Sequence, residues 1–411
     1  MTKIIFTSKT TARPFTKNSR VINYAGQKNK LGEIYMTYKN FLFLIFLLPQ
    51  LSLGAKANAK DIILGAVFPM TGPIATYGQE SVNGMKLALK KINLKGVRGK
   101  KIRLIIEDNK GEPVESANAV RKLISVDDVL AIIGSVASSN TLAGAPIAQS
   151  AKVPMLTPAS TNEQITKTGK YLSRTCFTDA FQGEVMAKFA YNSLNKRTAA
   201  VIVDLSSDYS KGLAQIFRKK FKAMGGTIID KNFAYNQKDT DFRTLLRKVS
   251  RKKPDVIFVP GYYQEVGLIL RQARSMGIEM PFIGGDGWHS DSLQQLAGAK
   301  GIKNNFYSSH FSPDDTDPAV QDFVKEYVAA YGSKPGAMAA LGYDGLMVMA
   351  DALKRSKSLN REDLQKAIAS TKNFKGITGV ITLDAQRNAR KSAVVLETTP
   401  EGNVFREKIS P

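Results

Sequence analysis

Short runs of aliphatic and β-branched residues alternate with longer segments whose apolar residues recur at helical spacing. The short runs predict buried strands, and the longer segments predict helices that cover them. The first series predicts strands at 62–68, 101–106, 129–133 and 153–156, and helices at 82–92, 114–124 and 141–151. This repeated alternation is typical of an α/β domain built on a parallel sheet.

A second series of similar size predicts strands at 198–203, 227–230, 255–259 and 281–284, and helices at 211–224, 242–251 and 265–276. Two series predict two lobes, with the changeover near residues 176–181, where Thr178 and Asp179 precede a new helix. The last third predicts helices at 319–331, 337–355 and 364–370, then a hairpin of 393–397 and 403–405. Because these late helices need a sheet to cover, we expect them to pack on the outer face of the first lobe.

The first 59 residues differ from the rest of the chain. A basic segment is followed by Met36, an apolar run at 41–48 and the ending Ala57-Asn58-Ala59. This order predicts a secretory signal peptide that is removed before Lys60, so that the mature protein is periplasmic. The alternative is an N-terminal membrane anchor, but the small-residue ending argues against it, and no cysteine follows that could carry a lipid. Residues 1–35 precede Met36, so they are either the result of a translation start assigned too far upstream or an unusual N-terminal extension.

Composition restricts the function classes further. The chain has 411 residues, of which 43% are apolar and 23% charged, which suits two folded domains and excludes a disordered protein. The net charge is +24; residues 1–59 hold 9 basic and 1 acidic residue (+8), which leaves +16 for the rest. The basic residues are spread over helix faces without interleaved aromatics, which predicts a solvated surface, or one that meets an anionic outer leaflet or docking partner, and no nucleic-acid partner. The apolar runs after residue 59 are too short to span a membrane, so we expect a soluble protein.

Cysteine and histidine are too scarce for several kinds of site. Cys176 is the only cysteine, so the chain forms no internal disulfide. With only His289 and His310 in addition, we expect no metal site and no cofactor, and we place His289 at the rim of a binding site. The chain also lacks the nucleophile-elbow, phosphate-loop and dinucleotide-binding motifs. A serine hydrolase built on Ser138 would need a base, and neither histidine lies in a recognisable context, so we do not predict an enzyme.

Two loops rich in hydroxyl groups follow predicted strands. The first, at 134–141, contains Ser138 and Ser139; the second, at 156–162, contains Ser160 and Thr161. Ligands of parallel sheets bind beyond the carboxyl ends of the strands, and free N–H groups at a helix start hold anions. The pair of loops therefore predicts a site for a carboxylate. The alternative is that Ser138, Ser139 and Thr161 are only helix N-caps.

A third loop, at 284–288, places Asp286 among three glycines after a predicted strand. The glycines would let a ligand approach the backbone, and the carboxylate would pair with an ammonium group. Together with the hydroxyl loops, this pattern indicates an α-amino acid. The alternative is that Asp286 caps a helix beginning near residue 291. Three tyrosines that follow predicted strands, Tyr77, Tyr209 and Tyr262, would wall the pocket.

Five ordered motifs together resemble the branched-chain amino-acid periplasmic binding proteins of ABC importers. They lie at 65–78, 134–141, 157–162, 261–274 and 284–288, and the resemblance extends from residue 61 to the end. It implies a type I clamshell of two α/β lobes, each a parallel sheet flanked by helices, with three interlobe crossings. We assign residues 60–179 and 310–389 to lobe 1, and residues 180–309 and 390–411 to lobe 2.

The resemblance also implies roles for the candidate residues. Ser138 and Thr161 with nearby backbone, including the loop residue Ser160, would hold the ligand's carboxylate, and Ala159 backbone, Thr161 and Asp286 its ammonium. The chain departs from enteric members of the family at two positions: Ala137 stands where they have a disulfide-bonded cysteine, and Asp286 where they have glutamate. The shorter side chain moves the anion by about one methylene, worth roughly 1 kcal/mol.

The sequence thus predicts a non-enzymatic, monomeric solute-binding protein that delivers leucine, isoleucine or valine to an ABC permease in the inner membrane. Ligand contacts that span both lobes would favour a closed state. Three alternatives stay open: the same scaffold binding amides, urea or aromatic acids, a ligand-sensing domain of a regulatory system, and, third, a secreted hydrolase.

Overall fold

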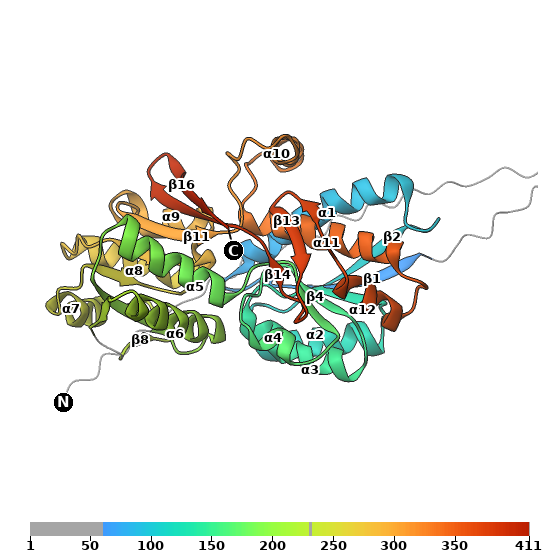
Figure 1. Ribbon diagram of the computed structural model, residues 1–411, viewed down its shortest axis with the longest axis horizontal. Helices are drawn as coiled ribbons and strands as arrows, with labels where there is room; N and C mark the ends of the chain where they lie inside the picture. Colours follow the sequence, from blue (N-terminus) through green and yellow to red (C-terminus); the bar gives the residue numbers. More distant parts are fainter. Residues whose placement is uncertain (1–60, 230–231, 411) are drawn as a thin grey trace, which may run out of the picture. The chain divides into compact units, whose positions relative to one another are not determined.

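Five short strands form the first sheet, in the order β2-β1-β3-β4-β5, with every neighbouring pair parallel (Figure 1). The computed structural model describes residues 61–229 and 232–410; the predicted signal peptide at 1–59 lies outside these residues. The elements of this part are β1 Ile62–Phe68, α1 Ala75–Lys95, β2 Ile102–Asp108, α2 Pro113–Ser125, β3 Ala131–Gly134, α3 Ser138–Ser150, β4 Met155–Thr157, α4 Gln164–Lys167 and β5 Leu172–Arg174. The strand–helix alternation predicted for residues 62–156 is confirmed.

The second sheet has the strand order β16-β15-β11-β10-β9-β6-β7, with β8 also paired to β6. Its core strands β6, β9, β10 and β11 are parallel, whereas β15 and β16 are antiparallel and extend one edge. The elements are α5 Asp179–Lys188, a π-helix Phe189–Ser193, β6 Thr198–Asp204, α6 Asp208–Ala223, β7 Thr227–Ile228, β8 Phe233–Tyr235, α7 Arg243–Arg251, β9 Val256–Phe258, α8 Tyr263–Ser275, β10 Phe282–Gly284, η2 Asp286–Trp288, α9 Asp291–Gly301 and β11 Asn305–Ser309.

The last third of the chain returns to the first sheet before it rejoins the second. Its elements are α10 Pro318–Tyr331, α11 Ala337–Arg355, α12 Arg361–Ala369, β12 Phe374–Gly376, β13 Gly379–Leu383, β14 Ala389–Arg390, β15 Ala393–Thr399 and β16 Gly402–Ile409. Helix α11 packs along α1, as expected for a late helix that covers the first lobe. Strands β15 and β16 form the predicted hairpin on the edge of the second sheet. These sheet memberships agree with the proposed lobe boundaries and with three crossings, both of which stay predictions.

Close approach of α1 and α11 depends on two glycines. A Cβ atom built on Gly84 would lie 1.9 Å from the carbonyl oxygen of Ala339, and one built on Gly342 would lie 2.1 Å from that of Ser81. Both distances are far below van der Waals contact, so only glycine allows the two backbones to lie this close. This contact holds the C-terminal third against the first sheet.

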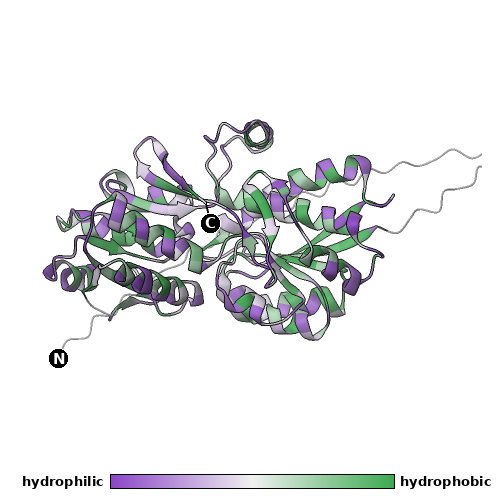
Figure 2. Ribbon diagram, in the orientation of Figure 1, coloured by the Kyte–Doolittle hydropathy of each residue, from purple (hydrophilic) through white to green (hydrophobic). Residues whose placement is uncertain are grey.

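Hydropathy follows the architecture (Figure 2). Apolar residues concentrate in the strands, and the helices carry both polar and apolar residues, as expected of helices that cover a buried sheet.

Strand β11 was not predicted, because its sequence Asn305-Phe-Tyr-Ser-Ser309 is mostly polar although all five residues are buried. Within the described ranges, no helix combines the length and the apolarity that crossing a bilayer requires.

Candidate functional site

Ten residues from the parts of the chain that form the two sheets line one small cavity, with about 10 Å³ of interior space. One water molecule needs roughly 10–15 Å³ of such space, so the side chains fill most of the site in this arrangement. Seven of the eight predicted ligand-binding residues are among the ten: Tyr77, Ser138, Ala159, Thr161, Tyr209, Tyr262 and Asp286. The other three lining residues are Val136, Gly287 and Met338, of which the sequence analysis considered only Gly287, as one of the glycines around Asp286.

Strand ends place most of these side chains. Ser138 follows β3, Ala159 and Thr161 follow β4, Tyr262 follows β9, and Asp286 follows β10. Because the strands of each sheet core are parallel, their carboxyl ends meet at one edge, which is where ligands of such sheets bind. The prediction that these loops come together is therefore confirmed.

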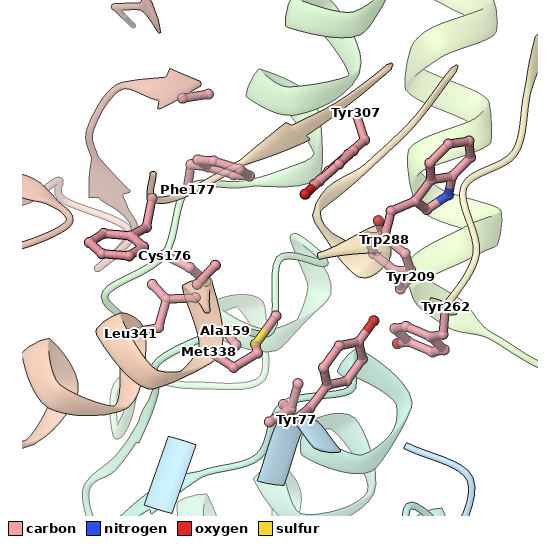
Figure 3. Close-up of a cluster of buried hydrophobic side chains, with 14 of the residues drawn as sticks. Tyr77, Ala159, Cys176, Phe177, Tyr209, Tyr262, Trp288, Tyr307, Met338 and Leu341 are labelled. Atoms are coloured by element: carbon pink, nitrogen blue, oxygen red, sulfur yellow. The ribbon is translucent and has the colours of Figure 1, made fainter. Parts of the chain in front are cut away.

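Tyr77, from the part of the chain that forms the first sheet, and Tyr209 and Tyr262, from the part that forms the second, make up an aromatic wall (Figure 3). Tyr209 and Tyr262 stack with ring centroids 5.3 Å apart, and Tyr77 meets Tyr262 edge to face at 6.1 Å. The hydroxyl of Tyr77 donates a hydrogen bond to the carbonyl of Gly287, whose N–H donates to the hydroxyl of Tyr209 at 3.2 Å. All three rings are buried, so the wall offers apolar surface, and the hydroxyl groups of Tyr77 and Tyr209 are already bonded.

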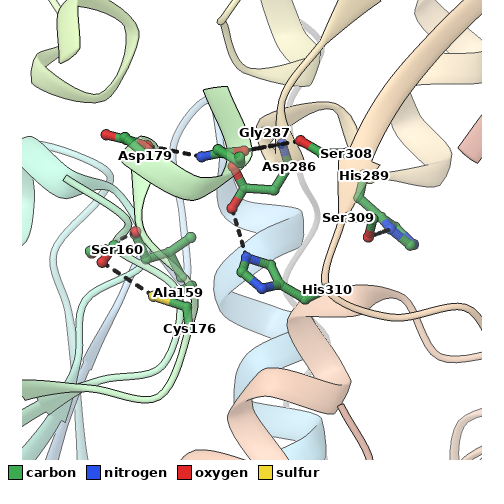
Figure 4. Close-up of polar contacts among 12 residues, drawn as sticks. Ala159, Ser160, Cys176, Asp179, Asp286, Gly287, His289, Ser308, Ser309 and His310 are labelled. Atoms are coloured by element: carbon green, nitrogen blue, oxygen red, sulfur yellow. Dashed lines mark hydrogen bonds and ion pairs between the residues drawn. The ribbon is translucent and has the colours of Figure 1, made fainter. Parts of the chain in front are cut away.

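In the same cavity, Asp286 provides a buried carboxylate. The residue is 3% exposed, and its Oδ2 lies 3.0 Å from Nε2 of His310 (Figure 4). Its other oxygen, Oδ1, has no hydrogen-bond partner among the described residues. Buried carboxylate oxygens are costly to leave unpaired, so Oδ1 is free to accept a donor from a bound cation.

Asp286 does not cap the following helix. The N-cap of α9 is Ser290, whose hydroxyl accepts from the N–H of Ser292 at 3.2 Å. The helix-cap alternative for Asp286 is therefore wrong, because the three-residue helix η2 separates it from α9.

The hydroxyl loops are likewise not helix caps. Ser138 is the first residue of α3 and its hydroxyl accepts from the N–H of Asn162 at 3.2 Å, whereas Ser139 accepts from the N–H of Asp208 at 2.9 Å. The N-cap position of α4 is Glu163 and not Thr161. The N-cap alternative is wrong for all three residues, because none occupies the N-cap position and the hydroxyls of Ser138 and Ser139 bond to loops distant in sequence.

Ser160 does not line the cavity. Its hydroxyl donates to the carbonyls of Ser135 and Val136, at 3.0 and 2.7 Å, and lies 2.7 Å from the hydroxyl of Thr141. These contacts tie the second hydroxyl loop to the first, so its side chain shapes the loop while Ala159 and Thr161 on either side face the cavity.

The glycines around Asp286 make room for aromatic side chains more than for a ligand. A Cβ atom on Gly285 would lie 2.3 Å from the hydroxyl oxygen of Tyr209, and one on Gly284 would lie 2.1 Å from the Trp288 indole. Only Gly287 lines the cavity. The predicted close approach of a ligand to this backbone is thus restricted to Gly287.

A second buried carboxyl lies near the site. Gln182 donates to Oδ1 of Asp179 at 2.8 Å and accepts from the N–H of Asp286 at 3.2 Å, so one amide links the two acids. Burial raises the pKa of Asp179 to about 7, with a smaller contribution from the charge of Asp286 and an opposing one from a hydrogen bond to Thr161. Sequence analysis missed Gln182, because nothing near it in the sequence marks it as polar core.

The two histidines have different surroundings. His289 is not at a rim: it is buried, it does not line the cavity, and its Nδ1 lies 2.6 Å from the hydroxyl of Ser309. Burial lowers its pKa to about 4. His310, to which the sequence analysis gave no role in binding, contacts Asp286. Within residues 61–229 and 232–410, no group of three His, Cys, Asp or Glu side chains could hold a metal ion.

The fold and the site together define a two-lobed solute-binding protein, and comparison with known proteins gives the family. The family model described as "Periplasmic binding protein" matches residues 61–398. The chain therefore belongs to this family, and the resemblance to its branched-chain amino-acid members is confirmed.

Its relatives include binding proteins named for these amino acids. The "Leu/Ile/Val-binding protein homolog 1" of Brucella suis is 29% identical over 86% of this chain and 94% of its own length. The leucine-binding protein LivK of Thermotoga maritima is 38% identical, with a TM-score of 0.82, over 85% of this chain and 99% of its own. LivJ of Streptococcus pneumoniae, solved with isoleucine, is 35% identical, with a TM-score of 0.80, over 86% of this chain and 100% of its own.

Proposed function

We propose that this protein binds one branched-chain amino acid, leucine, isoleucine or valine, in the cavity around Asp286. The observation that carries the proposal is the buried carboxylate of Asp286, whose Oδ1 has no partner among the described residues and which lines a cavity walled by three tyrosines. The unpaired oxygen would accept from the ligand's ammonium group. The names of the chain's relatives support the same ligand class.

Each part of the ligand has a complementary surface. The hydroxyl groups of Ser138 and Thr161, with the N–H groups at the start of α3, would hold the ligand's carboxylate without a lysine or arginine. Tyr77, Tyr209 and Met338 would pack against the aliphatic side chain, since all three line the cavity. Ala159 would contribute its backbone.

We further propose that the protein works in the periplasm and delivers its ligand to an ABC permease. Hydrogen bonds already cross between elements of the two sheets: Asp208 donates to Ser139, and Tyr263 donates to the carbonyl of Pro73 at 3.0 Å. A ligand that contacts Ser138 on one side and Asp286 on the other would favour this closed arrangement, which a permease can recognise.

Thermal melting tests this function. The purified full-length product is unfolded and refolded to remove carried-over ligand, and is then melted with each of the twenty amino acids, urea, acetamide and benzoate. A ligand at one hundred times its dissociation constant stabilises the folded state by about 2.7 kcal/mol, which raises the melting temperature by several degrees. A shift confined to leucine, isoleucine and valine supports the proposal. A shift with amides or aromatic acids alone would reject it in favour of those ligands.

A further inference from the structure

We propose that His310 is a positioning residue for amino-acid recognition: it holds one oxygen of Asp286 so that the other is presented to the ligand's ammonium group. This inference rests on the proposed function, since it concerns how the same site distinguishes an amino acid from a carboxylic acid without the ammonium group.

The hydrogen bond between the two side chains is directional. Nε2 of His310 lies 3.0 Å from Oδ2 of Asp286. An ionised carboxylate can only accept, so the hydrogen of a neutral imidazole lies on Nε2 and Nδ1 is left as an acceptor. Nδ1 has no partner among the described residues. The contact to Asp286 is therefore the only hydrogen bond that orients this ring within the part of the chain that the structure describes.

Stacking fixes the plane of the ring. His310 lies on Phe177 with ring centroids 3.6 Å apart and an interplanar angle of 22°. Both side chains are buried, His310 at 3% and Phe177 at 1% exposure. Phe177 lies between β5 of the first sheet and α5, and His310 follows β11 of the second, so the stack joins the two segments that run between the sheets. A ring held in this way cannot turn away from Asp286 without opening the core.

Asp286 needs such an anchor. Among the described residues its side chain has one hydrogen-bond partner, His310, and its backbone N–H donates to Gln182. A carboxylate that rotates about its last bond would have to be ordered when the ligand binds, and ordering a side chain costs affinity. With Oδ2 occupied by His310, Oδ1 is held ready, and the hydrogen bond is charge-assisted.

The charge state of His310 suits this role. Burial lowers the pKa of His310, and its hydrogen bond to Asp286 and the charge of Asp286 oppose this effect. The charge of Lys391 also lowers the pKa of His310, and His310 in turn lowers the pKa of His289. A neutral ring leaves the full negative charge of Asp286 for the ligand. A protonated ring would neutralise it and would carry a second N–H with no acceptor among the described residues.

Two substitutions and two ligands test the inference. His310→Phe keeps a ring to stack on Phe177 but removes the donor, and His310→Gln restores a donor at about the same reach. Leucine is compared with 4-methylpentanoate, the same molecule without its ammonium group, by calorimetry and by competition. His289→Gln is the matched control, because His289 is equally buried but does not contact Asp286.

We expect His310→Phe to weaken leucine binding about tenfold or more, to change 4-methylpentanoate binding less than about twofold, and His310→Gln to recover most of the loss. Equal losses for both ligands, or leucine binding unchanged in His310→Phe, would overturn the inference. If the wild-type chain binds no amino acid, the proposed function fails with it, so the wild-type titration separates the two failures.

A measurement on the wild type covers the case in which the variants do not fold. Nitrogen NMR of the imidazole groups reports which ring nitrogen carries hydrogen. We expect one neutral histidine at pH 7 with its hydrogen on Nε2 and a resonance that moves when leucine binds. A His310 protonated on Nδ1 in the ligand-free protein would overturn the inference.

Discussion

At the scale of the residue, the candidate site differs from its surroundings in which polar atoms are already bonded. The hydroxyl of Ser160 is fully used inside the protein, whereas Oδ1 of Asp286 has no partner among the described residues. A buried acceptor without a partner is unstable unless a ligand or water completes it. We therefore expect Asp286 to contribute more to affinity than the seven other predicted residues.

Replacing Asp286 by asparagine tests this ranking. Asp286→Asn leaves a buried ammonium group without its counter-charge, so leucine affinity should fall at least about tenfold. Isothermal titration measures the change, and Asp322→Asn, an exposed carboxylate on α10, is the control. Unchanged affinity in Asp286→Asn would remove this residue from the site.

Met338 should influence which side chain is preferred. It lines the cavity at the start of α11, close to Ala159 and Tyr77 in Figure 3. Met338→Ala removes apolar contact area, so leucine should bind about tenfold more weakly, a loss of about 1.4 kcal/mol, while the bulkier phenylalanine should lose less. Competition titrations with the two amino acids measure the ratio. Equal losses for both would mean that Met338 does not contact the ligand's side chain.

At the scale of the element, the contact between α1 and α11 should contribute to stability and to the geometry of the site, because Tyr77 lies on α1 and Met338 on α11. Gly342→Ala would place a Cβ atom 2.1 Å from the carbonyl of Ser81. Overpacking of this kind destabilises by about 1–3 kcal/mol, so the melting temperature should fall by several degrees. Circular dichroism detects this, with Lys86→Ala on the exposed face of α1 as the control. A melting temperature equal to that of the control would show that the helices can separate without cost.

At the scale of the whole molecule, buried carboxyls should shape the dependence of stability on pH. Burial raises the pKa of Asp179 from 3.8 to about 7, so between these pH values the folded state binds more protons than the unfolded state. The free energy of unfolding therefore loses a contribution from Asp179 as the pH rises from about 4 to about 7. Other groups add their own slopes, so a variant is needed to isolate this one.

Asp179→Asn provides that comparison, because asparagine does not titrate. The variant should gain stability relative to the wild type as the pH rises through this range, by an amount that urea denaturation at pH 4, 5.5 and 7 resolves. Parallel pH profiles of the two proteins would contradict the raised pKa of Asp179.

How far the sequence predicts this protein depends on how local each feature is. Strands β1 and β6, and helices α2 and α6, begin and end within a few residues of their predicted bounds, because buried strands and amphipathic helices have periodic patterns. Strand β11 escaped prediction because its polar residues are bonded inside the protein: Ser308 donates to Gln182, far away in the sequence. Short edge strands such as β12 and β14 carry too few residues for a pattern.

The sequence by itself determined the parallel α/β architecture and the loops at strand ends, since the order of polar and apolar residues along the chain encodes both. Only the tertiary structure decided which side chain in each loop faces the cavity, that the Ser160 hydroxyl bonds inside the protein, and that His310 contacts Asp286, 24 residues away in sequence. It also brought Met338, from a helix of the last third, beside Tyr77 of the first. These choices depend on packing between segments distant in sequence, which no local pattern records.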